Sequence, residues 1–123
     1  MPNFKPLEMK EFNNDDNLII YSDGRIFNKT TQDFIKPSKT RMGYYNFWFN
    51  GKTYVLHRVI AETFIPNPNG FKYINHKDTC LDNNFIENLE WCTKKYLNNY
   101  NKWLTDKITK EELDNYNTKE YNK

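Results

Sequence analysis

The stretch YINHKDTCLDNNFIENLEW, residues 73–91, decides how the rest of the chain is interpreted. Asn75-His76 lies at its centre, and His76 is one of two histidines in the sequence. Histidine can take up a proton near neutral pH without help from its surroundings. The residues that follow carry amide and carboxylate oxygens, which suit hard divalent cations such as Mg²⁺ or Mn²⁺. They are Asp78, Asp82, Asn83, Asn84 and Asn88. A base beside such a cation is suited to activating water against a phosphodiester.

Further motifs stand at fixed distances from Asn75-His76. They are Leu56-His57-Arg58, the run AETFIPNP of residues 61–68, Asp82-Asn83-Asn84 and the run NLEWCT of residues 88–93. In order and spacing, residues 55–100 resemble the HNH endonucleases of phage and mobile-intron type. Several apolar anchors recur at set distances from the histidine, so the match is far more specific than a lone His-Asn pair.

The resemblance implies a ββα-metal fold. Residues 71–76 would form its first strand, residues 89–93 the antiparallel partner and residues 94–104 the helix. The catalytic histidine would then end the first strand, and the helix would supply a metal ligand from the far side. The loop of residues 77–88 is long for a hairpin, and long ordered loops are usually functional. No structural zinc is expected, because Cys80 and Cys92 are too few and too far apart.

Site roles follow from the resemblance position by position. His76 is the expected general base, which activates water. Asn88 is expected either to orient the imidazole of His76 or to fix the loop that holds it. Asn75 occupies the place of a metal-binding aspartate in some relatives and of asparagine in many others, and a neutral amide binds a divalent cation less strongly than a carboxylate. The other loop residues are expected to shape the loop through hydrogen bonds to its backbone: Asp78, Asp82, Asn83 and Asn84.

The predicted helix departs from the family pattern at one position. The pattern has a metal-binding His or Asn nine residues after the position of Asn88, where this chain has Leu97. Asn98 is adjacent, but one residue along a helix rotates a side chain by about 100°, so Asn98 substitutes only if the helix is slipped by one residue. Asn101, one turn beyond Leu97, faces the right way but lies deeper along the axis. Either the register is shifted, with Asn75 and Asn98 as metal ligands, or the metal site is damaged.

Two hypotheses of different classes follow. In the first, the chain is a metal-dependent, homing-type endonuclease that nicks or cleaves double-stranded DNA with one Mg²⁺ or Mn²⁺ ion. In the second, it is a catalytically impaired HNH-fold protein that binds DNA or inhibits a protein partner. The first hypothesis predicts turnover that depends on His76 and on a divalent cation. The second predicts binding that is indifferent to both.

The chain as a whole is expected to be an α+β protein with one modest core. Its 123 residues and 17% aromatic content favour a single domain whose core depends on rings. Residues 1–54 are predicted to form an irregular arm, residues 1–16, followed by one small antiparallel sheet. That sheet would contain two hairpins, residues 17–27 and 44–56, which turn at Asp23-Gly24 and Asn50-Gly51.

Residues 55–104 are predicted to form the nuclease core and residues 105–123 a helical tail. The core begins with a short helix at residues 57–65, which Pro66 ends. Its predicted buried stripe is Val59, Ile60, Thr63 and Phe64. In the tail, Thr109 caps a helix at residues 110–116. Ile108, Leu113 and Tyr116 are predicted to dock it on the body, and residues 117–123 to be frayed.

A basic segment precedes the motif and is predicted to contact DNA. The chain has a net charge of only +2, but no acidic residue lies between Phe34 and Ala61. His57 is expected to orient the active-site loop or to touch a phosphate, and Arg58 to contact a phosphate or to pair with Glu62. One face of the second hairpin would pack on the following helix, and the other would be partly exposed or lie against DNA. The candidate DNA-binding residues are Lys36, Lys39, Arg41, Lys52, His57 and Arg58.

The remaining expectations concern partners and place. The predicted partner is double-stranded DNA, bound by a monomer or weak dimer, and a lone site is expected to nick one strand. The sequence has no apolar run long enough for a signal peptide or a membrane helix. The protein is therefore expected in the cytoplasm of a host cell, encoded by a phage or mobile element. Cys80 and Cys92 are expected to be free thiols, with Cys92 buried.

Overall fold

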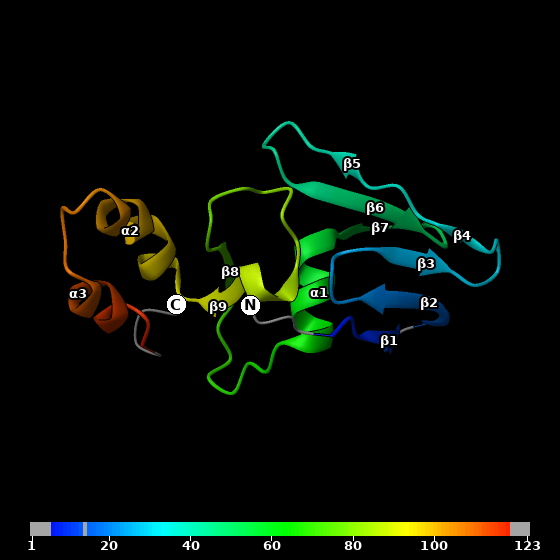
Figure 1. Ribbon diagram of the computed structural model, residues 1–123, viewed down its shortest axis with the longest axis horizontal. Helices are drawn as coiled ribbons and strands as arrows, with labels where there is room; N and C mark the ends of the chain where they lie inside the picture. The colour runs from blue at the N-terminus through cyan, green and yellow to red at the C-terminus, as the bar shows by residue number, and fades with distance from the viewer. Residues whose placement is uncertain (1–5, 14, 119–123) are drawn as a thin grey trace.

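The computed structural model describes residues 6–13 and 15–118, whose arrangement Figure 1 shows. This part of the chain is α+β, as predicted. Short antiparallel sheets lie at one end, two helices at the other, and a third helix lies between them. Residues 1–5 of the predicted arm and residues 119–123 of the predicted frayed tail lie outside the described residues. Within the described ranges, no helix has the length and apolar character needed to cross a membrane.

A four-stranded antiparallel sheet opens the fold, in the order β1 (Met9–Phe12), β2 (Asp15–Tyr21), β3 (Ile26–Asn28) and β4 (Asp33–Phe34). The predicted turn at Asp23-Gly24 joins β2 to β3, and Gly24 takes a φ of 95°. The prediction of an irregular arm is wrong at β1, which pairs with β2. β1 is an exposed edge strand without alternating polarity, so its pairing with β2, and not its own pattern, makes it a strand.

A second sheet contains β5 (Ser38–Lys39), β6 (Tyr45–Phe49) and β7 (Lys52–Val55). The predicted turn Asn50-Gly51 joins β6 to β7, with both turn residues at positive φ. The prediction that both hairpins share one sheet is wrong. β4 extends the first hairpin and β5 extends the second, and the two sheets share no strand.

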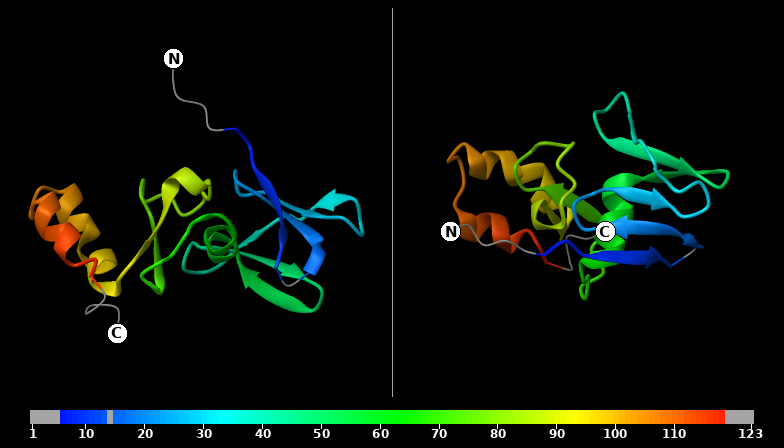
Figure 2. Two further views of the ribbon diagram at one scale, coloured as in Figure 1. Left: turned by 90° about the horizontal axis from the view of Figure 1, so that it is seen from below. Right: turned by 45° about the vertical axis from the view of Figure 1, so that its right-hand side comes forward.

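Helix α1 (Leu56–Phe64) joins the two halves of the molecule. It lies between the N-terminal sheets and the antiparallel pair β8 (Tyr73–His76) and β9 (Leu89–Cys92), as the left view of Figure 2 shows. Thr63 and Phe64 of the predicted stripe are only half-buried. The buried residues of α1 are Leu56, Val59, Ile60 and Ala61.

One hydrophobic core runs through both predicted segments, residues 1–54 and 55–104. The first sheet contributes Leu18, Ile20 and Ile26, the second sheet contributes Phe47 and Phe49, and the strand pair contributes Ile74 and Leu89. All of these side chains are buried in contact with α1 or with one another. The N-terminal sheets are therefore part of the body that carries the motif.

A second, smaller core holds α2 (Lys94–Leu104) and α3 (Lys110–Asn115) together. Residues 94–104 form the predicted helix, which Thr93 caps by accepting a hydrogen bond from the Tyr96 backbone nitrogen at 3.1 Å. Cys92 is buried in this core, as predicted. Burial raises the pKa of its thiol to about 12, so the thiol stays protonated.

The tail docks on this second core, as predicted. Leu113 is fully buried, and Ile108 and Tyr116 pack against the same cluster. Thr109 caps α3 by accepting a hydrogen bond from the Glu112 backbone nitrogen at 3.1 Å. Asn117 lies within the segment predicted to be frayed, yet its Oδ1 accepts a hydrogen bond from the Thr93 backbone nitrogen at 2.8 Å.

The turn of the first hairpin lies against the loop that precedes the short 3₁₀ helix η1 (Ile86–Asn88). The Ile86 backbone nitrogen donates to the Ser22 carbonyl at 3.0 Å. A Cβ placed on Gly24 would lie 3.2 Å from the carbonyl oxygen of Asn84. The N-terminal sheet therefore helps to fix the loop that carries Asn84.

Gly24→Ala is expected to destabilise the protein more than Gly51→Ala. Both glycines have positive φ, which costs a non-glycine residue roughly 1–2 kcal/mol. A Cβ at residue 51 would meet no atom within 4 Å, whereas a Cβ at residue 24 would press on Asn84. We expect this crowding to remove about a further 1 kcal/mol of unfolding free energy. Urea denaturation of both variants measures the difference. Equal losses of unfolding free energy would mean that the loop around Asn84 moves to make room for the added Cβ.

Candidate active site

His76 ends β8 and is almost fully buried. Its Nε2 lies 2.8 Å from Oδ1 of Asn84. The amide of Asn84 is oriented by a second contact, because its Nδ2 donates to the Leu81 carbonyl at 3.4 Å. An amide oxygen can only accept, so Nε2 of the neutral ring carries the proton and Nδ1 keeps the lone pair. His76 is therefore held in the tautomer in which Nδ1 is the basic atom.

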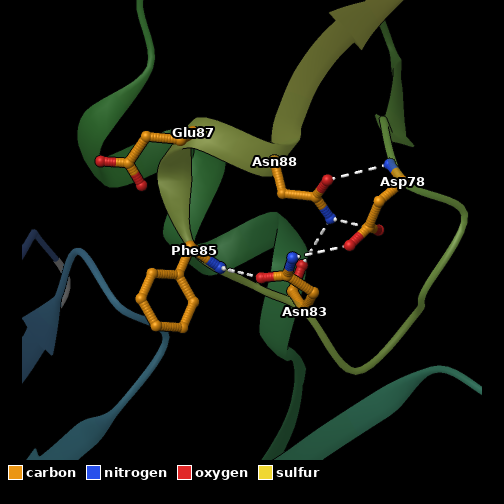
Figure 3. A pocket seen from close by; sticks show the side chains of 5 residues that line it. All are labelled: Asp78, Asn83, Phe85, Glu87 and Asn88. Carbon is orange, nitrogen blue, oxygen red and sulfur yellow. Dashed lines mark hydrogen bonds between the residues drawn. The ribbon is translucent and has the colours of Figure 1, made fainter. Parts of the chain in front are cut away.

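Asn88 braces the loop that follows His76. Its Oδ1 accepts a hydrogen bond from the Asp78 backbone nitrogen at 2.9 Å. Its Nδ2 donates to Asp78 Oδ1 at 2.9 Å and to the Asn83 carbonyl at 2.8 Å. These contacts, drawn in Figure 3, agree with the second of its two expected roles, fixing the loop. The direct partner of His76 is Asn84, which the sequence suggested only as a loop-shaping residue.

Asp78 is the centre of the loop's hydrogen bonds. Its carboxylate accepts from Asn83 Nδ2 at 2.7 Å and from the Cys80 backbone nitrogen at 2.8 Å. These two hydrogen bonds lower the pKa of Asp78, with a smaller contribution from Asn88. Asp78 and Asn83 also line an open depression of about 470 Å³ beside Phe85 and Glu87, to which His76 does not contribute (Figure 3). The side chains of the loop therefore contribute to its shape, in addition to its contact with the first hairpin turn.

His76 lines a smaller cavity of about 190 Å³. Asn75 lies beside it on β8, and Leu97 and Asn101 reach the cavity from α2. Asn98 is solvent-exposed and is not among the lining residues, so the register slip that would bring it to His76 does not occur. The full lining is Tyr44, Ile74, Asn75, His76, Thr79, Leu81, Leu97, Tyr100 and Asn101.

Two curated relatives come from Acanthamoeba polyphaga mimivirus. The one named uncharacterized HNH endonuclease L245 is 36% identical over 113 residues, which is 85% of this chain and 34% of the relative. The one named uncharacterized HNH endonuclease L247 is 28% identical over 81 residues, covering 62% of this chain and 20% of that protein. The chain thus spans about a third of the length of the first relative and a fifth of that of the second. No family model matches it.

Among solved structures, the HNH homing endonuclease I-HmuI, in a study of its DNA binding and cleavage, has a similar fold. The TM-score is 0.69 at 24% sequence identity, over 88% of this chain and 64% of I-HmuI. In sequence this chain is similar to proteins named HNH endonucleases, and in fold it is similar to an HNH homing endonuclease. The expected ββα arrangement of the HNH motif is present as β8, β9 and α2.

HNH endonucleases generally use a divalent metal, and the cavity offers oxygen donors of the right kind. Asn75 and Asn101 both line it, and the oxygen of an asparagine amide is a suitable ligand for Mg²⁺ or Mn²⁺. No carboxylate lines the cavity, and the described residues contain no group of three or more His, Cys, Asp or Glu that could hold a metal. The residues that line the cavity therefore offer neutral oxygen donors, which fit a hard divalent cation, and no carboxylate.

His57 packs against the HNH histidine. Its ring centroid lies 5.1 Å from that of Tyr44 and 5.1 Å from that of His76, the latter edge-on. Burial, followed by the positive charge that His76 and Arg58 can carry, lowers the pKa of His57 to about 4. The ring is neutral at pH 7 and brings no charge to a phosphate. The geometry thus favours the orienting role over the expected phosphate contact.

The low pKa of His57 predicts a loss of stability in mild acid. In the unfolded chain the pKa of His57 has its ordinary value of 6.5. Between pH 6.5 and pH 4, His57 therefore binds a proton in the unfolded chain but not in the folded chain. The stabilisation is complete above pH 6.5 and is lost as the pH falls through 4. We expect this group to account for roughly 1–3 kcal/mol of the fall in unfolding free energy. Urea denaturation at pH 7, 5 and 4 measures it.

His57→Phe is the matched control for that titration, because it keeps a ring beside Tyr44 and His76 but cannot take up a proton. Its stability is expected to fall less steeply with pH than that of the parent protein. Parallel curves for the two proteins would show that His57 does not contribute to the acid sensitivity.

The candidate DNA-binding residues fall into two groups. Lys36, Lys39, Arg41 and Lys52 are all exposed on or near the second sheet. The guanidinium of Arg58 already has partners within the protein. It donates to the Lys72 carbonyl at 2.8 Å and lies over the Trp91 ring at 5.7 Å. No ion pair joins Arg58 to Glu62 in the part of the chain that the structure describes.

The second sheet has one buried and one open face. Phe47 and Phe49 point into the core, whereas the side chain of Trp48 is 65% exposed. Trp48 lines a shallow hollow with Asn46 and Lys39. The expected packing of one face is therefore present, and the other face is open to a partner.

Proposed function

We propose that the chain is a metal-dependent HNH endonuclease that nicks or cleaves double-stranded DNA, with His76 as the general base. The observation that carries this proposal is the setting of His76 in the cavity. Asn84 accepts from Nε2 and leaves Nδ1 as the basic atom, and Asn75 and Asn101, whose amides can supply oxygen ligands, line the same cavity. This combination suits the activation of a water molecule next to a phosphate.

Each residue of the site has a distinct task in this proposal. Nδ1 of His76 takes the proton from the attacking water, and Asn84 stabilises the imidazolium that results. Asn88 keeps the loop in place through Asp78. Asn75 and Asn101 would hold the Mg²⁺ or Mn²⁺ ion. The bound ion would stabilise the negative charge that develops on the phosphate.

The exposed basic residues support DNA as the substrate. Lys39 and Lys52 lie on the second sheet, Lys36 and Arg41 on its connecting segments, and Trp48 offers an exposed ring on the outer face. The DNA binding and cleavage named for I-HmuI point the same way. The proposal includes a monomer or weak dimer that nicks, acting in the cytoplasm of a host cell. Viral relatives support a virus or mobile element as the source.

Leu97 favours a second candidate function. This apolar side chain lines the cavity at the position where the family pattern has a metal ligand. A protein with the same fold and the same basic surface, but without hydrolysis, would act by binding DNA or by inhibiting a protein partner. Under this candidate, binding would depend neither on a divalent cation nor on His76.

Incubation of the purified protein with supercoiled plasmid in Mg²⁺, in Mn²⁺ and in EDTA separates the two candidates. Conversion to nicked circle in either metal, and none in EDTA, is the expected result. A gel shift that weakens with added salt, without any conversion in either metal, would instead support the binding protein.

A further inference from the structure

A polar network lies directly behind Asn75. The strand pair places Asn75 opposite Glu90, and Asn75 Nδ2 donates to Glu90 Oε2 at 2.8 Å. The Tyr96 hydroxyl donates to the same oxygen at 3.0 Å. Lys110 of α3 approaches the Tyr96 hydroxyl at 3.5 Å. The carboxylate of Glu90 is therefore held by groups from β8 and α2, with a cation close behind.

The contact with Glu90 fixes which end of the Asn75 amide faces the cavity. Nδ2 is engaged by the carboxylate, so Oδ1 is the branch left for the cavity that Asn75 lines with His76. A carboxylate can only accept hydrogen bonds, and it therefore selects the nitrogen of the amide.

Glu90 also brings a negative charge close to a cavity that has none of its own. It does not line the cavity but lies one hydrogen bond behind it. The charge of Glu90 acts on two tyrosines of α2, Tyr96 and Tyr100. The pKa values of Tyr96 and Tyr100 are raised first by burial and next by Glu90.

We propose that Glu90 is a positioning residue, which turns Oδ1 of Asn75 into the cavity as an oxygen ligand and places a carboxylate behind that neutral ligand. The inference rests on the proposed function, because the group that Oδ1 would meet is the divalent cation. It also explains how asparagine serves at residue 75. An aspartate there would lie opposite Glu90 and repel it, so Asn75 and Glu90 together replace a directly bound carboxylate.

Mn²⁺ binding, followed by the loss of the electron paramagnetic resonance signal of the free ion, tests the inference without any turnover. Glu90→Gln keeps an oxygen acceptor and removes the charge, and it is expected to weaken Mn²⁺ binding about 10-fold. Glu90→Leu removes both and is expected to weaken it further, towards about 100-fold. Glu62→Gln, an exposed carboxylate on α1, is the matched control and is expected to bind as the parent does.

A double-mutant cycle tests the link between the two residues. Asn75→Asp alone is expected to bring no tighter binding, because of repulsion from Glu90. Combined with Glu90→Gln, it is expected to bind Mn²⁺ about 10-fold more tightly than the parent. Unchanged affinity in both Glu90→Gln and Glu90→Leu, or tighter binding by Asn75→Asp alone, would overturn the inference while leaving the proposed function intact. Melting temperatures confirm that each variant is folded.

A readout without metal separates failure of the inference from failure of the proposed function. The side-chain amide protons of Asn75 are expected to exchange slowly with solvent in the parent and faster in Glu90→Leu, as measured by NMR. If the parent binds no Mn²⁺ but this difference is present, the proposed function fails and the positioning stands. Equal exchange in the two proteins would overturn the positioning.

Discussion

Replacing His76 by alanine is expected to lower the rate of metal-dependent nicking by roughly 10²–10⁴-fold, the usual contribution of a general base. The loss follows from the lone pair on Nδ1, which Asn84 makes available by accepting the proton of Nε2. Single-turnover nicking of supercoiled plasmid measures it. Gel shifts with the same DNA are expected to be unchanged, because the basic residues of the second sheet do not depend on His76.

Two companion variants guard against a loss that is merely structural. His76 is buried, so alanine leaves a cavity, whereas His76→Asn fills more of the space and has no basic nitrogen. Both variants are expected to be equally impaired. His57→Asn, at the neighbouring ring, is expected to lose much less. If His57→Asn were the more damaging change, the base would have to be assigned to His57.

Leu97→Asn is expected to have the second-largest effect, as a gain. Leu97 lines the cavity with Asn75 and His76, so an amide at this position would add an oxygen ligand to the two proposed for the metal, Asn75 and Asn101. A metal ligand that contributes about 1.4 kcal/mol of binding free energy tightens Mg²⁺ binding about tenfold. The Mg²⁺ concentration that gives half-maximal nicking is therefore expected to fall by about 10-fold or more. A titration of nicking rate against Mg²⁺ measures it.

Leu104→Asn is the matched control for that gain. It makes the same chemical change on the same helix, but residue 104 is exposed and lies outside the cavity. Its Mg²⁺ dependence is expected to match that of the parent. An equal Mg²⁺ requirement in Leu97→Asn and Leu104→Asn would show that α2 does not face the metal, and would favour the DNA-binding candidate.

Much of the fold was predictable because local signals and the family pattern agreed. Asp23-Gly24 and Asn50-Gly51 are strong turn signals, and both turns form where predicted. Thr109 predicts the start of α3, and Pro66 the end of α1. These features depend on a few neighbouring residues, so the sequence carries them directly.

The errors concern pairings between distant segments. β1 was not predicted, because an edge strand needs no alternating pattern of its own. The partition into two sheets was also missed, since it depends on β4 and β5, each only two residues long. The pairing of strands depends on tertiary packing, and strands of two residues are too short to show a recognisable sequence pattern.

The same limit applies to the site. The chain is rich in asparagine, so no pattern distinguishes Asn84, which contacts His76, from Asn88, which braces Asp78. Similarly, the choice between Asn98 and Asn101 depends on the register of α2 against β8, which is a tertiary property. Glu90 was missed because its importance lies in facing Asn75 across the strand pair.

The contact between the first hairpin turn and the loop around Asn84 has a consequence for how the candidate active site forms during folding. Ser22 and Gly24 are synthesised early and Asn84 and Ile86 late, and the contact between these two segments helps to place Asn84, the partner of His76. Bringing distant segments together is slow compared with local folding. Recovery of nicking during refolding should therefore follow completion of the whole molecule, and residues 55–104 produced alone should not form a competent nuclease.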